Sequence, residues 1–276
     1  MNALEIRGLT KRRGDFALQG LDLTLPAGCI MGLIGENGAG KSTTIRLILN
    51  ALSRDGGTVA VYGKDNRALT PLEREDIGVV LDEVGLPEYM NAQQIGRMMA
   101  GIFTHWQPEA YAGYLRRLAL PEDKPFRDFS RGMKMKQGLA VALSHQPKLL
   151  LLDEATSGLD PVVRDEILTI FSDFTRDEEH AVLLSSHIVS DLEKICDYIA
   201  FLHKGRLLLC EEKDRLTEAY GILRGGAEDI DPAAVCGRHT TPYGTEYLVR
   251  RDAVPAGMAL GQVNLEDLFV FMAKEV

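Results

Sequence analysis

The stretch "LIGENGAGKST", from Leu33 to Thr43, places three glycines, a lysine and two hydroxyl side chains directly after an apolar run. From Gly35 to Ser42 it matches the pattern GxxxxGK[ST] at every fixed position. The backbone N–H groups of so bare a loop can surround phosphate oxygens, and the positive end of a following helix favours the same anion. The stretch therefore predicts a phosphate-binding loop, in which Lys41 reaches the outer phosphates and Ser42 binds Mg²⁺.

The segments around this loop follow the order that the pattern requires. "CIMGLIG" is nearly all apolar and predicts a strand covered on both faces, and "TTIRLILNAL", from Thr43 to Leu52, has apolar residues at helical spacing. The alternative is a glycine turn that only begins a helix, and the preceding strand argues against it. Further along, "KLLLLDE", "AVLLSSH" and "YIAFLHKG" predict strands that alternate with helices, which is typical of an α/β fold with a mostly parallel sheet.

Further parts are expected around this α/β core. Alternating apolar residues predict an N-terminal antiparallel β subdomain from Ala3 to Pro26, and helical spacing predicts an inserted α-helical subdomain at about residues 86–145. We assign residues 1–220 to the main domain and residues 221–276 to a small C-terminal accessory α/β lobe.

The expected accessory lobe contains two recognisable elements. A hairpin is predicted around Tyr243 and Gly244, within "VCGRHTTPYGTEYLVRRD". The segment "NLEDLFVFMAKE" predicts a closing amphipathic helix. Its apolar face comprises Leu265, Leu268, Phe269 and Met272.

The segment "KLLLLDE" also carries two acids, Asp153 and Glu154, directly after four leucines. Side chains that follow a buried parallel strand emerge at the edge of the sheet where ligands of such folds bind. One acid can hold Mg²⁺ through a water molecule, while its neighbour on the opposite side of the strand can polarise an attacking water. The alternative is a polar pair that only ends the strand. With the loop upstream, the pair predicts hydrolysis of a bound triphosphate.

Composition limits the partners and the location. The formal net charge of −9 and the pI of about 5.2 give a surface that as a whole repels phosphates, so we expect no nucleic acid as partner. The first twenty residues lack the apolar block of a signal peptide, and no apolar run of about 18 residues is present. The four cysteines form no CxxC pair and predict free thiols in a reducing cytosol.

From Ala3 to about Glu211 the chain resembles the ATP-binding cassette (ABC) ATPases. The resemblance rests on motifs in the family's order and spacing, namely "GENGAGKST", "FSRGMKMKQGLAVAL", "LLLLDE", "SGLD" and "SSH". It implies a P-loop NTPase core, ATP and Mg²⁺ as cofactors, and ATP hydrolysis coupled to transport. It also implies a homodimer, or a heterodimer with a second cassette, in which two cassettes pack head to tail around ATP.

The resemblance also implies roles for individual residues. Glu154 looks like the general base and His187 like the switch residue that contacts the γ-phosphate, and both act with Lys41. In the dimer, residues of one copy would close on the ATP held by the other; they are Ser130, Gly132 and Asp160. The phosphates and magnesium would be held by the loop residues Asn37, Gly38, Ala39, Gly40, Lys41, Ser42 and Thr43, with Asp82 and Asp153 as further metal ligands.

Some positions depart from the family pattern. Arg13 stands where an aromatic residue usually stacks on adenine, but a guanidinium plane can also stack on a base, and Phe16 is nearby. The signature has "FSRGM" instead of "LSGGQ", so that Arg131 could add positive charge near the phosphates. Asp82 replaces a glutamine. We expect it to remain a magnesium ligand, and the alternative is a carboxylate merely exposed at a strand end.

The segment after Asp82 leads into the helical insert, which in the family receives a helix of the membrane subunit. Its apolar and methionine-rich side chains suit a docked partner helix, although they could equally form the core of the insert. The set comprises Leu86, Pro87, Tyr89, Met90, Met98, Met99 and Phe103.

The preferred function is the ATP-binding and ATP-hydrolysing subunit of an ABC transporter. We expect an exporter, a separately encoded transmembrane permease subunit as partner, and a peripheral location on the cytoplasmic face of the membrane. A soluble ABC ATPase acting on ribosomes or DNA is disfavoured by the single cassette and the acidic charge. A nucleotide-gated regulator without turnover, suggested by the unusual positions, is disfavoured by the intact loop and acid pair.

Overall fold

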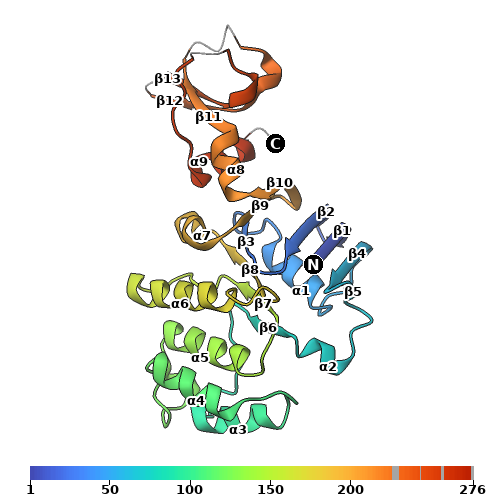
Figure 1. Cartoon of the computed structure of the whole chain (residues 1–276), viewed down its shortest axis with the longest axis vertical. Helices are drawn as coiled ribbons and strands as arrows, with labels where there is room; N and C mark the ends of the chain where they lie inside the picture. Colours follow the sequence, from blue (N-terminus) through green and yellow to red (C-terminus); the bar gives the residue numbers. More distant parts are fainter. Residues whose placement is uncertain (226–229, 243, 256–257, 275–276) are drawn as a thin grey trace.

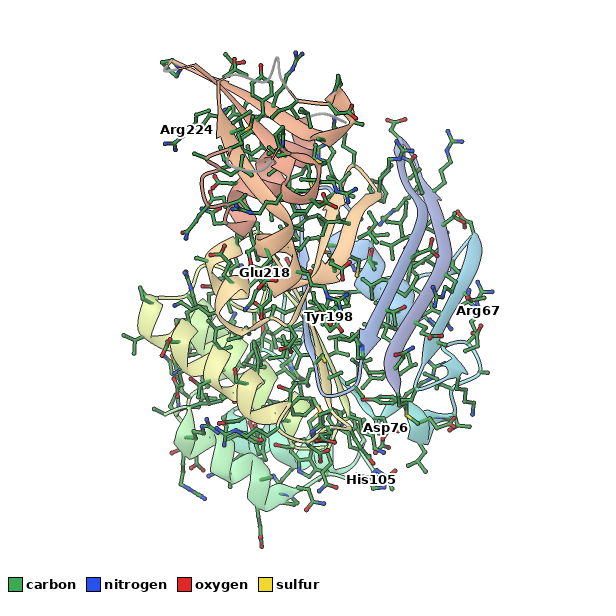
Figure 2. All side chains as sticks on the ribbon, turned by 45° about the horizontal axis from the view of Figure 1, so that its top comes forward. Arg67, Asp76, His105, Tyr198, Glu218 and Arg224 are labelled. Atoms are coloured by element: carbon green, nitrogen blue, oxygen red, sulfur yellow. The ribbon has the colours of Figure 1, made fainter. Side chains whose placement is uncertain are left out.

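The computed structural model describes residues 1–225, 230–242, 244–255 and 258–274. Its strands form an antiparallel sheet near the N-terminus, a larger central sheet and a small sheet near the C-terminus (Figure 1). The helical insert lies at one end of the molecule and the C-terminal sheet at the other (Figure 1). Figure 2 shows the same separation, with His105 in the insert and Arg224 in the C-terminal part.

The central sheet carries the strands that flank the phosphate loop. They are β3 (Ile30–Ile34), β6 (Ile77–Val80), β7 (Leu149–Asp153), β8 (Ala181–Ser186), β9 (Tyr198–His203) and β10 (Arg206–Glu212). Their order is β10-β9-β3-β8-β7-β6, and all neighbouring pairs are parallel except β9 and β10. Every residue of β3, β7 and β8 is buried, because other layers cover both faces of the sheet. The prediction of a mostly parallel sheet is confirmed.

The N-terminal sheet covers one face of the central sheet. It consists of β1 (Asn2–Arg13), β2 (Phe16–Pro26), β4 (Gly56–Val61) and β5 (Lys64–Asp65), in the order β2-β1-β4-β5. Its pairs are antiparallel, as predicted. The buried side chains of Leu4 and Ile6 share one hydrophobic core with Met31 and Leu33 of β3. This layer therefore fixes the strand from which the phosphate loop leaves.

Helices complete both faces of the central sheet. α1 (Lys41–Ile48) belongs to the core shared with the N-terminal sheet, while α6 (Pro161–Phe174) and α7 (Val189–Ile195) belong to the core on the other face. α1 ends before the predicted Leu52, because Asn50 adopts the left-handed conformation with φ of 53°. The four-residue α2 (Pro71–Arg74) was not predicted. In the described part of the chain, no helix is both long and apolar enough to cross a bilayer.

The helical insert has its own apolar centre. It contains α3 (Ala92–Ala100), α4 (Pro108–Arg117), the short helix η1 (Phe126–Asp128) and α5 (Arg131–Leu143). Tyr111 is buried against Trp106 and its hydroxyl donates to the carbonyl of Ala92 at 2.8 Å. α5 also packs on β6, so that the insert is held directly to the central sheet. The predicted insert is confirmed.

A buried histidine closes the junction between the insert and the central sheet. His145 follows α5, and its ring stacks on Phe103 with the ring centroids 4.1 Å apart. Its Nδ1 lies 2.9 Å from the carbonyl oxygen of Glu75. Burial lowers the pKa of His145, because the charged imidazolium would lose its hydration.

This depressed pKa predicts a loss of stability in mild acid. An unfolded histidine takes up a proton below about pH 6.5, whereas folded His145 resists it, so that protonation stabilises the unfolded chain first. The free energy of unfolding should fall as pH drops below about 6.5, and less steeply in His145→Gln. Urea denaturation at a series of pH values measures both slopes, which should coincide above about pH 7. Equal slopes in mild acid would contradict the prediction.

The C-terminal part forms a third layer. Its elements are α8 (Lys213–Ala219), β11 (Tyr220–Arg224), η3 (Pro232–Ala234), β12 (Val235–Thr241), β13 (Gly244–Arg250), η4 (Arg251–Ala253) and α9 (Leu265–Lys274). The strands pair antiparallel in the order β11-β13-β12. The β12–β13 hairpin is confirmed, with Gly244 opening β13, whereas Tyr243 lies outside the described residues. The division at residue 220 stays a prediction.

α9 holds this lobe against α7 and β9. The ring of Phe269 meets Phe201 of β9 at 5.4 Å between centroids, and the backbone N–H of Leu265 donates to Glu193 of α7 at 2.8 Å. Leu265 and Leu268 are fully buried, as predicted for the apolar face. Phe271 is also buried, which the helical-spacing prediction did not include.

Candidate functional site

The phosphate loop has the backbone of an anion cradle. Gly38 and Gly40 adopt left-handed conformations, with φ of 85° and 116°. A Cβ at Gly40 would lie 2.8 Å from Cζ of Phe16, so a larger residue would displace that ring and also strain the left-handed backbone. Gly40 precedes α1 and offers no side-chain cap, which leaves the N–H groups of the first turn available to an anion. The N–H of Gly205, in the turn after β9, donates to the carbonyl of Ala39 at 2.9 Å and so fixes the backbone of the loop.

Three charged or titratable groups form a row beside the loop. Lys41 is only 5% exposed, and its Nζ lies 2.7 Å from the carbonyl oxygen of Gly35 and 3.0 Å from Oε1 of Glu154. The other carboxylate oxygen of Glu154 lies 2.7 Å from Nδ1 of His187. The fold thus brings together the three residues for which we predict catalytic roles. The carboxylate of Glu154 lies between the ammonium of Lys41 and the imidazole of His187.

The backbone at Glu154 is strained. Its φ of 53° places a non-glycine residue in the left-handed region, which costs about 1 kcal/mol or more. Its backbone N–H points at Ser185, with the carbonyl and hydroxyl oxygens of that residue both at 3.1 Å. Strained backbone at the end of a buried strand is typical of residues placed for function. The turn carries the side chain of Glu154 to the wall of the phosphate cavity.

Asp153 occupies a different environment from its neighbour. It is 4% exposed, and its Oδ1 accepts a hydrogen bond from the hydroxyl of Ser185 at 2.6 Å. Asp153 and Ser185 are register partners in the parallel strands β7 and β8. Ser185 therefore orients both acids, a role that was not predicted from the sequence. The feature of the sequence that could have indicated this role is the position of Ser185 in "SSH", at the end of the predicted strand that follows the acid pair.

A cavity of about 420 Å³ opens over the loop. Its size suits a small organic ligand. Arg13 and Phe16 line one side, which keeps both available to stack on a base. Ala39, which belongs to the loop, is buried and does not line the cavity. The other lining residues are Glu36, Asn37, Gly38, Gly40, Lys41, Ser42, Thr43, Asp82 and Glu154.

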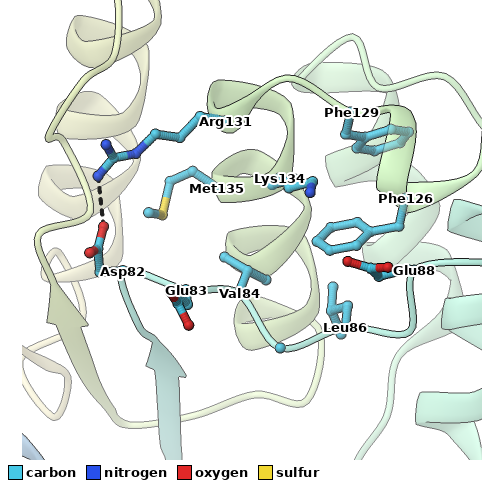
Figure 3. A pocket seen from close by; sticks show the side chains of 11 residues that line it. Asp82, Glu83, Val84, Leu86, Glu88, Phe126, Phe129, Arg131, Lys134 and Met135 are labelled. Carbon is cyan, nitrogen blue, oxygen red and sulfur yellow. Dashed lines mark hydrogen bonds and ion pairs between the residues drawn. The ribbon is translucent and has the colours of Figure 1, made fainter.

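Asp82 belongs to two cavities at once. It lines the cavity above the phosphate loop and also a neighbouring cavity of about 640 Å³ between the segment after β6 and the start of α5. In that second cavity Oδ1 of Asp82 lies 2.6 Å from Nη2 of Arg131 (Figure 3). Two of the unusual positions of the sequence, Asp82 and Arg131, are therefore joined in space.

The remaining predicted residues lie outside the chain's own phosphate cavity. The hydroxyl of Ser130 accepts from the N–H of Met133 at 3.3 Å and so caps α5, which Gly132 continues. Asp160 caps α6, where its carboxylate accepts from the N–H groups of Val162 and Val163, both at 3.1 Å. These contacts are structural, and a role toward the nucleotide of a second copy stays a prediction.

The donors near the loop suit a magnesium ion. The hydroxyl of Ser42 and the carboxylates of Asp82 and Asp153 are hard oxygen donors, which Mg²⁺ prefers. Among the residues that the structure describes, no three His, Cys, Asp or Glu side chains gather closely enough to hold a metal alone. Phosphate oxygens and water would therefore have to complete the shell, as is usual for magnesium bound with a nucleotide.

Comparisons with known proteins identify the family. Residues 18–157 match the family model described as "ABC transporter". The bacitracin transport ATP-binding protein BcrA of Enterococcus faecalis is 32% identical, over 95% of this chain and 87% of that protein. The daunorubicin/doxorubicin resistance ATP-binding protein DrrA of Streptomyces peucetius is 35% identical, over 93% of this chain and 80% of that protein.

Solved structures share the fold. The structure of an ATP-binding subunit of an ABC transporter superposes with a TM-score of 0.72 at 25% identity, covering 78% of this chain and 92% of that one. A dimeric ATP-binding cassette bound to ADP and phosphate has a TM-score of 0.68 over 76% of this chain and 98% of that one; at 18% identity it shows the fold alone. The chain therefore belongs to the ABC transporter family, as one of the ATP-binding subunits that hydrolyse ATP to power transport.

Proposed function

We propose that this chain hydrolyses Mg·ATP as one half of a head-to-tail pair of cassettes, either two copies of itself or this chain with a second cassette. The pair would drive export through a separately encoded transmembrane permease subunit, while lying peripherally on the cytoplasmic face of the membrane. The observation that carries the proposal is the position of Glu154, held between Lys41 and His187 at the wall of the phosphate cavity.

Each residue of this row has a chemical task. The ammonium of Lys41 and the N–H groups of the loop stabilise negative charge on the outer phosphates. An arriving phosphate competes with Glu154 for Lys41, because the ammonium lies 3.0 Å from the carboxylate. Glu154, once released, accepts the proton of the attacking water, and His187 holds that carboxylate in place. Mg²⁺, when bound, neutralises phosphate charge, and Ser42, Asp82 and Asp153 are the residues that would hold it.

The surface around the signature helix supports the paired arrangement. Ser130, Gly132 and Asp160 do not line the cavity of their own chain. The start of α5 offers free N–H groups that suit an anion from another molecule.

An apolar groove supports the membrane partner. A cavity of about 360 Å³ lies between the segment after β6 and the insert, and Leu86, Met99 and Phe103 of the predicted docking set line it. Ile102, also in its wall, is 61% exposed. An amphipathic helix of the permease would cover such a groove. The relatives that transport bacitracin or confer daunorubicin resistance favour export as the direction.

The proposal predicts an unusual dependence of rate on protein concentration. Since each site needs residues of a second copy, phosphate release per molecule should rise as the protein is concentrated over about a 100-fold range. Steady-state phosphate release from the purified chain measures this, with Lys41→Ala as the inactive control. A rate per molecule that is constant over the whole range would contradict a pair made of two copies of this chain. No release above the control at any concentration would contradict hydrolysis by this chain alone.

A further inference from the structure

The ion pair between Asp82 and Arg131 joins two functional segments of the cassette. Asp82 lies after β6, Arg131 is the first residue of α5, and Nη2 of Arg131 is 2.6 Å from Oδ1 of Asp82 (Figure 3). The side chains are 52% and 54% exposed. Exposed ion pairs contribute little to folding stability and exchange partners readily. The pair is therefore poorly suited to a structural role and well suited to a reversible one.

Asp82 has two competing partners. Its carboxylate pairs with Arg131 on one side and lines the phosphate cavity with Lys41 and Ser42 on the other. A carboxylate engaged by a guanidinium has much of its charge neutralised, which makes it a weaker ligand for a divalent cation. Asp82 would therefore leave Arg131 if magnesium and nucleotide occupied the cavity.

Arg131 occupies the face that would meet a second copy. It follows the capping residue Ser130 directly, and its guanidinium packs on the "SGLD" segment, where a Cβ at Gly158 would lie 3.1 Å from Nη1. A guanidinium offers parallel N–H donors that match two phosphate oxygens. Once free of Asp82, the guanidinium of Arg131 is available on an exposed surface to donate hydrogen bonds to phosphate oxygens.

We propose that Arg131 contacts the phosphates of ATP held by a second copy, and that Asp82 holds it in reserve until magnesium and nucleotide occupy the first copy's own cavity. The inference rests on the proposed head-to-tail pair. It makes Arg131 a further phosphate-binding residue and Asp82 its positioning residue. Binding of nucleotide in the cavity of one copy would thereby free Arg131 of that copy to contact the nucleotide of the second copy.

The first test concerns the isolated cavity. A fluorescent ADP derivative, which lacks the γ-phosphate, is titrated with MgCl₂ to find the magnesium concentration for half-maximal binding. Arg131→Gln frees Asp82 and should lower that concentration roughly two- to fivefold, the range expected for an exposed pair. Lys64→Gln is the matched control, because Lys64 and Glu73 form an exposed pair of the same 2.6 Å length. An equal magnesium requirement in wild type and Arg131→Gln would overturn the competition.

The second test concerns the pair of cassettes. Glu154→Gln slows hydrolysis and serves as the background, in which ATP-induced dimers are measured by sedimentation. Adding Arg131→Gln should raise the ATP concentration needed for dimerisation about tenfold, because a charge-assisted phosphate contact is lost. Adding Arg131→Lys instead should restore part of the effect, since the charge remains.

The outcomes separate this inference from the function on which it rests. If the Glu154→Gln protein forms no dimer at any ATP concentration, the head-to-tail pair of two copies is wrong. If it dimerises and Arg131→Gln leaves the ATP requirement unchanged, the pair stands and Arg131 is no phosphate ligand. If Arg131→Gln makes dimerisation easier, Arg131 only restrains Asp82. The proposal requires that one substitution strengthen magnesium-dependent binding and weaken dimerisation.

Discussion

Replacing Glu154 with glutamine should slow phosphate release from Mg·ATP by about 100- to 1000-fold, as expected when a general base is lost. Glutamine has nearly the same shape and can still accept from Lys41, which lies 3.0 Å away in the native protein. Its amide cannot take a proton from the attacking water. Nucleotide binding should therefore survive while turnover is lost, and steady-state phosphate release together with equilibrium binding of a fluorescent nucleotide distinguishes the two.

A matched substitution controls for charge. Glu179→Gln removes an acid that is 74% exposed and pairs at 3.3 Å with Lys148 on the surface. This variant should hydrolyse ATP like the wild type. If Glu154→Gln also retained the wild-type rate, the base would have to be another group, and the row formed with Lys41 and His187 would have only a structural meaning.

Gly205→Ala should lower the free energy of unfolding by about 3 to 4 kcal/mol, the largest effect on stability that we expect from a single methyl group. Gly205 has a left-handed backbone with φ of 76°, and its added Cβ would lie 1.9 Å from the carbonyl oxygen of Ala17. The strand β2 and the turn after β9 would have to separate. Chemical denaturation measures the loss.

Gly63→Ala provides the comparison. Gly63 has a similar φ of 80°, but a Cβ there would meet no atom within 4 Å. Its substitution should cost only the backbone strain, about 1 kcal/mol. Gly205→Ala should also weaken nucleotide binding, because the N–H of Gly205 supports Ala39 in the phosphate loop. If the free energy of unfolding fell equally in the two variants, the close approach of residue 205 to Ala17 would contribute nothing to the destabilisation.

The sequence predicted those features that short segments determine. The phosphate loop needs glycines at fixed spacing, and buried parallel strands need continuous apolar runs, so both were recognised without the fold. The four-residue α2 is too short to give a helical period, and the end of α1 depends on a single left-handed residue, Asn50. Neither leaves a periodic signal.

Contacts between segments that are distant in the sequence could not be predicted from the sequence alone. Asp82 and Arg131 were each recognised as unusual, yet they are 49 positions apart, and only the packing of α5 on β6 brings them to 2.6 Å. The hydroxyl of Ser185 supports Asp153 and Glu154 because β7 and β8 are neighbours in the sheet. The left-handed backbone of Glu154 is a further feature that the sequence did not predict.

The packing of α9 has a mechanical consequence. α9 rests on α7 and β9 through Leu265 and Phe269, and α7 begins at Val189, two residues after His187. A displacement of α9 would therefore be felt by α7 directly, because the two helices are in contact. The position of the C-terminal lobe would thereby be coupled to that of the imidazole beside Glu154.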